Sequence, residues 1–162
     1  MYLIDANVLI RADADFYALD RIPQFWDWVS EQGNLGTIKI PREIYDEVVG
    51  HDDPLANWLK EDDHKDALLL DEEADPDLVQ QVLIDGYMAN DPRFDDAQIQ
   101  KIGRDAFLVA YALADVTRVI VTREVSAPSK ELGNRKVPDV CDDCGIEWTT
   151  DFELYRLLDF RL

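Results

Sequence analysis

The chain has 162 residues, of which 47% are hydrophobic, so it is large and apolar enough for a single folded domain over 1–162 and is not a disordered acidic tail. It carries 35 acidic and 16 basic side chains, a net charge of −19, which argues against passive binding to nucleic acid because phosphate affinity comes from basic groups. An enzyme whose metal ions bridge its own acids to phosphate is not excluded, and the acid surplus is equally compatible with solubility or with a high-salt host.

The sequence also argues against a membrane protein. No stretch approaches the length of a membrane span, and the N-terminus lacks a basic region followed by an apolar run. We therefore expect a cytoplasmic protein without membrane contact.

The first predicted strand covers residues 2–4, a short apolar run of the kind that is buried on both faces of a parallel sheet. Asp5 follows at its carboxyl end, where ligand sites form in open α/β sheets. The alternative is that Asp5 only caps a helix that begins near Asn7, because both residue types are good N-caps. Taken alone, this stretch favours capping.

A helix over 23–32 and a strand over 37–40 come next. The helix has a proline at its start and apolar residues at helical spacing. We expect its tryptophans, Trp26 and Trp28, to pack in the core rather than to stack on bases, because aromatic side chains dominate cores.

A helix over 41–49 carries two glutamates, Glu43 and Glu47, four residues apart. Ile44 and Val48 share the spacing that faces a core. Glu47 flanks this apolar stripe, so it can reach the edge of the sheet. We interpret Glu43 as part of a solvated acidic face.

The middle of the chain gives weaker signals. Residues 51–66 are dense in charge around a short helix over 54–60, and we interpret His51 and His64 as surface residues. Residues 67–70 are compatible with a short strand or a helix end. A helix from 75 to about 88 follows, and no further element is predicted before Gly103.

The most apolar helix covers 103–115 and should be buried, because it is apolar nearly all round. Asp105 lies in its first turn, where the helix dipole stabilises an acid, but this position also points at the strand ends. A strand over 118–122 follows and leads to Glu124. If this strand is a parallel neighbour of the first, Asp5 and Glu124 emerge at the same edge of the sheet.

The loop after this strand carries four basic residues in an otherwise acidic chain: Arg123, Lys130, Arg135 and Lys136. We expect this loop to contact phosphate. A helix over 138–144, a strand over 146–148 and a helix over 152–158 complete the chain. Cys141 and Cys144 have the gap of zinc or redox motifs. No second ligand pair exists, so we interpret them as small buried hydrophobes.

Four carboxylates thus stand near the ends of predicted strands or in helices beside them: Asp5, Glu47, Asp105 and Glu124. Their order and spacing resemble the PIN domain, a family of metal-dependent nucleases. The matching stretches are 3–9, 40–48, 105–112 and 119–124, which together extend over nearly the whole chain. The most specific are Asp5-Ala6-Asn7 and Thr122-Arg123-Glu124. Many PIN proteins carry aspartate where this chain has Glu124, so Asp139 and Asp142 are alternatives for the fourth acid.

The resemblance implies a three-layer α/β/α sandwich around a parallel sheet, with an acidic pocket that binds Mg²⁺ or Mn²⁺. It implies hydrolysis of RNA, often by the toxin of a toxin–antitoxin pair, so RNA, an antitoxin protein and a second copy of the chain are candidate partners. A divalent cation would relieve the mutual repulsion of clustered carboxylates, and hard oxygen ligands suit these two ions. The roles carried over are direct ligands for Asp5 and Asp105, a ligand or water-orienting base for Glu47, a second-metal ligand for Glu124, and supporting hydrogen bonds from Asn7 and Thr122.

Two alternatives remain open at this point. A phosphatase of the haloacid-dehalogenase type would use Asp5 as a nucleophile, but such enzymes usually place a second aspartate two residues on, where this chain has Asn7. A non-catalytic PIN-like binding module is favoured slightly by the acid surplus and by Glu124. Metal-dependent RNA cleavage by the pure protein would discriminate among the three.

Overall fold

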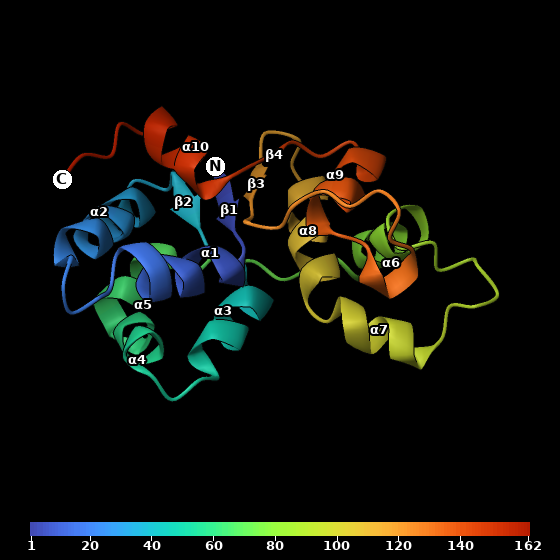
Figure 1. The fold of residues 1–162 in the computed structure, drawn as a ribbon, viewed down its shortest axis with the longest axis horizontal. Coiled ribbons are helices and arrows are strands. Elements are labelled where there is room, and N and C mark those ends of the chain that lie inside the picture. The colour runs from blue at the N-terminus through green and yellow to red at the C-terminus, as the bar shows by residue number, and fades with distance from the viewer.

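A parallel four-stranded sheet forms the centre of the molecule, with helices on both of its faces (Figure 1). The computed structural model describes residues 1–162. The strands are Tyr2–Ile4 (β1), Ile38–Lys39 (β2), Val119–Val121 (β3) and Trp148–Thr149 (β4), in the order β2-β1-β3-β4. The prediction of an α/β fold with a parallel sheet is confirmed.

The helices vary in length from six to twelve residues. They are α1 (Ala6–Arg11), α2 (Pro23–Asn34), α3 (Arg42–Val49), α4 (Pro54–Lys60), α5 (Asp62–Leu68), α6 (Pro76–Asp85), α7 (Asp96–Ile102), α8 (Asp105–Leu113), α9 (Val137–Cys144) and α10 (Asp151–Leu157), with a π-helical turn at Ala12–Phe16 and a 3₁₀ turn at Leu132–Asn134. None of these helices is both long and apolar enough to cross a membrane.

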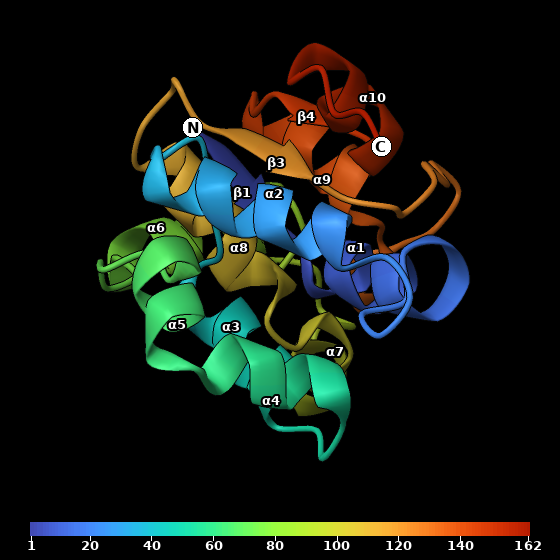
Figure 2. The ribbon, with the colours of Figure 1, turned by 90° about the vertical axis from the view of Figure 1, so that its left-hand side faces the viewer.

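The strand register puts alternate residues on the two faces of the sheet. Tyr2 pairs with Val119 and Leu3 with Ile120. Residues that pair across neighbouring strands point to the same face of the sheet, so Leu3 and Ile120, both fully buried, share one face. Ile4 is on the other face, among side chains of α2 and α10. Figures 1 and 2 show α2 on that side of the sheet and α8 on the opposite side.

Most predicted elements are present with shifted ends. The strand predicted over 37–40 shortens because Ile40 leaves β1 and forms an isolated bridge to Leu69. Residues 67–70, predicted as a strand or a helix end, supply both this bridge and the end of α5. The last strand lies at 148–149 rather than at 146–148.

The main omission is α7, for which no helix was predicted. Its seven residues bury only Ile102, so the sequence has no apolar stripe there. The helix begins instead with a local cap, in which the Asp95 carboxylate accepts a hydrogen bond from the Gln98 amide (3.1 Å). The start of α5 and the π-helical turn were also missed.

Two surface assignments are wrong. His64 is half-buried: its ring stacks on Trp58 at 4.1 Å between centroids and its Nδ1 is 3.0 Å from the Ser30 hydroxyl. Glu43 is not fully solvated, because its Oε2 is buried and has no hydrogen-bond partner. Trp26 is buried as predicted, and both cysteines are free thiols, with only Cys141 fully buried.

Candidate functional site

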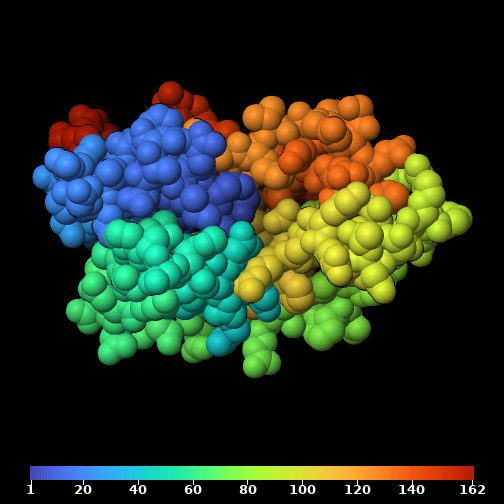
Figure 3. All heavy atoms as spheres, turned by 60° about the horizontal axis from the view of Figure 1, so that its bottom comes forward, coloured from blue at the N-terminus to red at the C-terminus, as the bar shows by residue number.

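The candidate site lies where the carboxyl ends of β1 and β3 meet. The Asp5 amide donates to the Val121 carbonyl (3.0 Å), which extends the β1–β3 pairing by one residue. Asp5 therefore leaves the sheet beside Thr122, and Glu124 follows two residues later. Figure 3 brings this side of the molecule forward, where the blue N-terminal segment and the teal α3 meet the yellow α7 and the orange loop. The predicted parallel placement of Asp5 and Glu124 is confirmed.

Asp5 is held by a set of side-chain hydrogen bonds. It is only 4% exposed, and its Oδ2 accepts from the Thr122 hydroxyl (2.7 Å) and from the Asn7 amide (2.5 Å). The Arg123 backbone N–H donates in turn to Asn7 Oδ1 (2.9 Å). Asp5 stands at the N-cap position of α1, yet its carboxylate makes no capping hydrogen bond, so the capping interpretation is wrong.

The four predicted acids influence one another electrostatically. Burial raises the pKa of Asp5 to about 6; the hydrogen bond from Thr122 opposes this, and the charges of Glu124 and Glu47 add to it. Burial, together with the charges of Asp5, Glu124 and Glu47, raises the pKa of Asp105 to about 8, and the charge of Lys136 opposes this rise. The four acids predicted from the sequence thus lie within electrostatic reach of one another.

The four acids differ in what already binds them. Both Glu124 oxygens are occupied, one by the Lys136 ammonium (3.2 Å) and one by the Val137 backbone N–H (2.7 Å), which ties β3 to the start of α9. No hydrogen bond reaches the carboxylates of Asp105 or of Glu47, and Glu47 is exposed. The oxygen Oδ1 of Asp5 is also free of hydrogen bonds.

The alternatives for the fourth acid do not join this group. Asp139 is buried and accepts from the Ser126 hydroxyl and from the Ala127 backbone N–H (2.8 Å), so it fixes the loop. Asp142 is exposed and accepts from the Trp148 indole N–H (3.0 Å). Neither acts on the pKa of Asp5 or of Asp105.

The donor chemistry suits a hard divalent cation, although the acids do not form a closed cage. No three His, Cys, Asp or Glu side chains converge as a ready metal site. Mg²⁺ commonly uses one or two carboxylates and completes its shell with water and phosphate oxygens. Asp105 and the free oxygen of Asp5 provide such a partial set, and Glu47 lies within electrostatic reach of both.

A basic pocket of about 400 Å³ opens beside these acids. It is lined by Lys101, Asp105, Glu124, Lys130, Gly133, Asn134, Arg135 and Lys136. A second pocket of about 310 Å³ is lined by Asn7, Arg11, Arg123 and Glu124. Glu124 belongs to both, so the two pockets adjoin at the acidic end of β3.

The two arginines among the four predicted basic residues form ion pairs within the protein. Arg123 pairs with buried Asp151 (2.8 Å), and its guanidinium lies 4.9 Å and 5.4 Å from the ring centroids of Phe16 and Phe152. Arg135 is largely buried; it pairs with Asp143 and donates to the Gly86 carbonyl (2.6 Å). Their side chains are therefore committed to the fold.

The two lysines of this loop, unlike the two arginines, are not taken up by buried ion pairs and stay available for the predicted contact with phosphate. Lys130 is exposed, and Lys136 reaches Glu124. Sequence reasoning missed Lys101 because it belongs to α7, which carried no helical signal.

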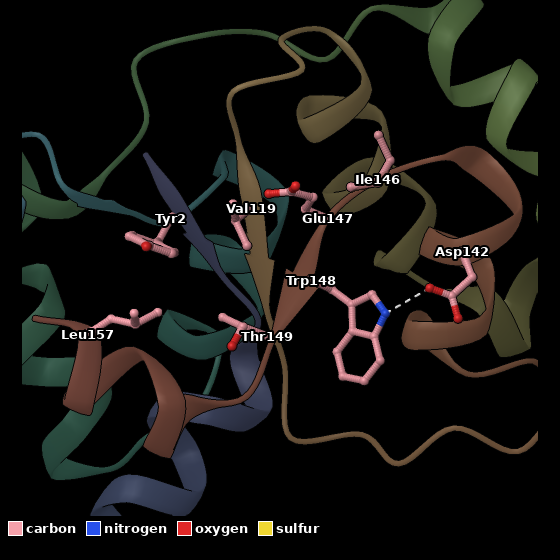
Figure 4. Close-up of a pocket in the computed structure, with 8 residues that line it drawn as sticks. All are labelled: Tyr2, Val119, Asp142, Ile146, Glu147, Trp148, Thr149 and Leu157. Atoms are coloured by element: carbon pink, nitrogen blue, oxygen red, sulfur yellow. Dashed lines mark hydrogen bonds between the residues drawn. The ribbon is translucent and has the colours of Figure 1, made fainter.

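A separate pocket of about 460 Å³ lies along the edge strand β4 (Figure 4). Tyr2, Val119 and Thr149 line it from the sheet and Leu157 from α10. Trp148 and Asp142 also line it, and the Trp148 indole N–H donates to Asp142 (3.0 Å). None of the four acids lines it, so it is distinct from the candidate site.

Tyr87 is a buried residue that the sequence did not single out and whose pKa responds to three of the four acids. Its side chain is completely buried and its hydroxyl has no hydrogen-bond partner. Burial and the charges of Asp105, Glu124 and Asp5 keep its pKa well above the usual value, so it is a neutral donor. No pattern in the sequence distinguishes this tyrosine from the others.

The comparisons with known proteins give a family without an assigned activity. No curated protein and no solved structure matches the chain. One family model matches residues 2–162, and the chain therefore belongs to the family described as Domain of unknown function (DUF4411).

Proposed function

We propose that the protein is a metal-dependent endoribonuclease with a PIN-like fold, which hydrolyses RNA phosphodiester bonds. The observation that carries the proposal is the pair Asp5 and Asp105, two buried or half-buried carboxylates at one edge of the sheet with no cationic side chain bound to either. Burying acids together is unfavourable unless a cation compensates them. The adjoining basic pocket supplies the phosphate contacts that such an enzyme needs.

The chain's own groups divide the work in the following way. Asp105 and the free oxygen of Asp5 hold the cation, while Thr122 and Asn7 fix the orientation of Asp5. Glu47, which is exposed and unbonded, orients the attacking water. A bound Mg²⁺ or Mn²⁺ would supply the activation of that water and stabilise the charge on the scissile phosphate.

The two adjoining pockets support an extended, single-stranded substrate. Lys101 and Lys130 lie on one side of Glu124, and Arg11 lies on the other. A single-stranded RNA that crosses Glu124 would place one phosphate at the acids and the neighbouring phosphates at these lysine and arginine side chains. The negative chain as a whole would repel nucleic acid elsewhere, which restricts binding to this surface.

A role as the toxin of a toxin–antitoxin pair is part of the same proposal, with an antitoxin and a second copy of the chain as partners. These partners rest on the PIN resemblance alone.

The test is cleavage of a labelled single-stranded RNA by pure protein in Mg²⁺, in Mn²⁺ and in EDTA. We expect cleavage only with a divalent cation, and none with Asp105→Asn. Asp142→Asn removes an equal charge from an exposed residue and should cut like the parent. Cleavage in EDTA, or equal activity of Asp105→Asn, would reject the proposal.

A non-catalytic binding module is the second candidate, because both oxygens of Glu124 are already hydrogen-bonded. A protein of this kind would bind RNA and leave it intact with either cation. The phosphatase alternative has less support, since the amide of Asn7 hydrogen-bonds Asp5 and cannot serve as a general acid.

A further inference from the structure

Glu124 differs from the other acids of the candidate site because a positive charge already occupies its carboxylate. Its Oε1 accepts from the Lys136 ammonium (3.2 Å) and its Oε2 from the Val137 backbone N–H (2.7 Å). Val137 begins α9, and a carboxylate at the start of a helix satisfies an amide that has no partner within the helix. Glu124 is thus held from two sides.

Hydrogen bonds link this ion pair to Asp5. The Glu124 backbone N–H donates to the Thr122 hydroxyl oxygen (3.2 Å), and the same hydroxyl donates to Asp5 Oδ2 (2.7 Å). Asp105, Glu124 and Lys136 also line one pocket of about 400 Å³. The contacts and the shared pocket therefore place the Lys136 ammonium beside the two proposed ligands of the cation, Asp5 and Asp105.

The Lys136 ammonium keeps donors free for a ligand. An ammonium has three N–H donors, and the side chain of Lys136 makes its only hydrogen bond to Glu124. The side chain is 40% exposed, so the remaining donors can reach a molecule in the pocket. Arg135, in contrast, donates to the Gly86 carbonyl and to Asp143. Lys136 is therefore positioned by Glu124 and is still able to bind an anion.

The position beside Glu124 is the one that a second metal ion would occupy. The PIN resemblance gives Glu124 the role of a second-metal ligand, yet the structure places a lysine there. In two-metal sites the ions lie roughly 3.5–4 Å apart, and both stabilise charge on the reacting phosphate. A lysine ammonium is a compact positive charge that also binds phosphate. A second ion at Glu124 would have to displace both the ammonium and the bond to α9.

We propose that Lys136 takes the place of a second metal ion, so that the site binds one divalent cation at Asp5 and Asp105 and contacts the phosphate with the ammonium that Glu124 holds. The inference rests on the proposed function and adds the number of cations and a group that touches the substrate. Lys136 stays protonated and stabilises negative charge on the phosphate, while Glu124 is a positioning residue. The occupied oxygens of Glu124 are then part of an active site.

The first test counts the Mn²⁺ ions bound per chain, by isothermal titration calorimetry and by electron paramagnetic resonance of the free ion. It is made with and without an uncleaved single-stranded RNA analogue. We expect one ion in the parent under both conditions, and one in Glu124→Gln, because Glu124 is not a ligand. Two ions in the parent, one of them lost in Glu124→Gln, would overturn the inference and leave the proposed function intact.

The second test uses Lys136→Gln, which removes the charge and keeps much of the side-chain length. Single-turnover cleavage at saturating RNA should fall about a hundredfold, as when one preorganised donor to a transition-state charge is lost. Because Glu124 then lacks its ammonium, the variant should bind a second Mn²⁺ at high concentration and recover part of its rate. The Val137 backbone N–H remains, so circular dichroism should show the parent's fold.

Lys60→Gln is the matched control, since it removes the same charge from the exposed end of α4, outside this pocket. It should equal the parent in ion number and in rate. A Lys136→Gln variant that cleaves like the parent, or one that is slow yet binds a single ion at every Mn²⁺ concentration, overturns the role of Lys136. A parent that binds no Mn²⁺ rejects the proposed function, and the inference with it.

Discussion

Two regions of the molecule bury carboxylates, and they differ in how those carboxylates are compensated. In the loop anchors, which we define as Asp139 and Asp151, every acid has partners: Ser126 and Ala127 for the first and Arg123 for the second. In the acidic edge, which we define as Asp5, Glu47, Asp105 and Glu124, only Glu124 has a cationic partner. Asp5 accepts hydrogen bonds from neutral groups, as Asp139 does, and the carboxylates of Asp105 and Glu47 accept none.

This difference separates structure from function. Asp139 and Asp151 hold the loop between β3 and α9 in place: Asp151 forms an ion pair with Arg123, and Asp139 accepts hydrogen bonds from Ser126 and Ala127. Unpaired acids at a strand end oppose folding, so their presence indicates a ligand that compensates them. The same residue type therefore stabilises one region and equips the other for binding.

The largest effect should be on catalysis. Asp5→Asn and Asp105→Asn each remove a charged ligand but keep the side-chain shape, so Mn²⁺-dependent RNA cleavage should fall to background. Asp139→Asn, in a loop anchor, should retain cleavage wherever the protein stays folded. Single-turnover assays with circular dichroism on each variant measure both properties. If the loop-anchor variant is inactive and the edge variants are active, the comparison is reversed.

The next largest effect should come from breaking a loop anchor. Asp151→Asn leaves the Arg123 guanidinium, 20% exposed, without its ionic partner. We expect the free energy of unfolding to fall by about 2–4 kcal/mol in urea titrations. Asp159→Asn breaks an ion pair on the surface and should change stability little. Equal effects of the two substitutions would show that the anchor has no special role in stability.

The basic pocket should govern the salt dependence of RNA binding. Replacing Lys101 and Lys130 by glutamine should reduce the slope of log affinity against log salt by about 0.7 for each phosphate that is no longer neutralised. Lys60→Gln with Lys65→Gln changes the net charge equally on α4 and α5, and should leave the slope unchanged. Filter-binding titrations with an uncleaved RNA analogue, at several salt concentrations, provide the measurement. A slope that responds equally to both pairs would point to net charge alone.

The smallest effect should be on the stability of the metal-free protein. The folded pKa of Asp105 is about 8 and its ordinary value is 3.8, so the folded state holds the proton more tightly. The stability that this proton contributes is therefore fully present below about pH 4 and falls as the pH rises towards 8. Asp105→Asn removes this dependence and should melt a few degrees higher than the parent in EDTA at pH 8, equivalent to about 1 kcal/mol.

The same thermal melts also test the alternative role of Asp105, as an acid that only stabilises the start of α8. If this acid only stabilises the start of α8, Asp105→Asn should instead lower stability by about 0.3–1 kcal/mol. Mn²⁺ should raise the melting point of the parent more than that of the variant, and the gain should grow with pH because the cation displaces a proton. Matched KCl controls for general screening of charge.

The placement of Asp5, Asp105 and Glu124 could be predicted because each follows or begins a strongly patterned element. Asp5 follows β1 and Glu124 lies three residues beyond β3, so parallel pairing of these strands puts both at one edge of the sheet, and Asp105 begins the most apolar helix. Glu47 required only the spacing of Ile44 and Val48. These positions depend on the apolar periodicity of single strands and helices and on the rule that parallel strands end at the same edge of a sheet.

The partners of each charge could not be predicted in this way. Arg123 was expected to contact phosphate, but it reaches Asp151, which is 28 residues away and is placed by the final helix. Lys101 depends on α7, whose polar sequence has a cap but no stripe. The unpartnered hydroxyls of Tyr87 and Tyr155 are apparent only from their burial in the fold. Such features arise from three-dimensional packing, which periodicity does not contain.

The sheet itself has a consequence for motion, because its strands are only two or three residues long. β1 is hydrogen-bonded on both sides, so the Asp5 amide, bonded to Val121, should exchange with solvent deuterium only on global opening. The loop beyond Glu124 is held mainly by side chains and should exchange faster. One wall of the candidate site is thus rigid, and the opposite wall can adjust around whatever enters.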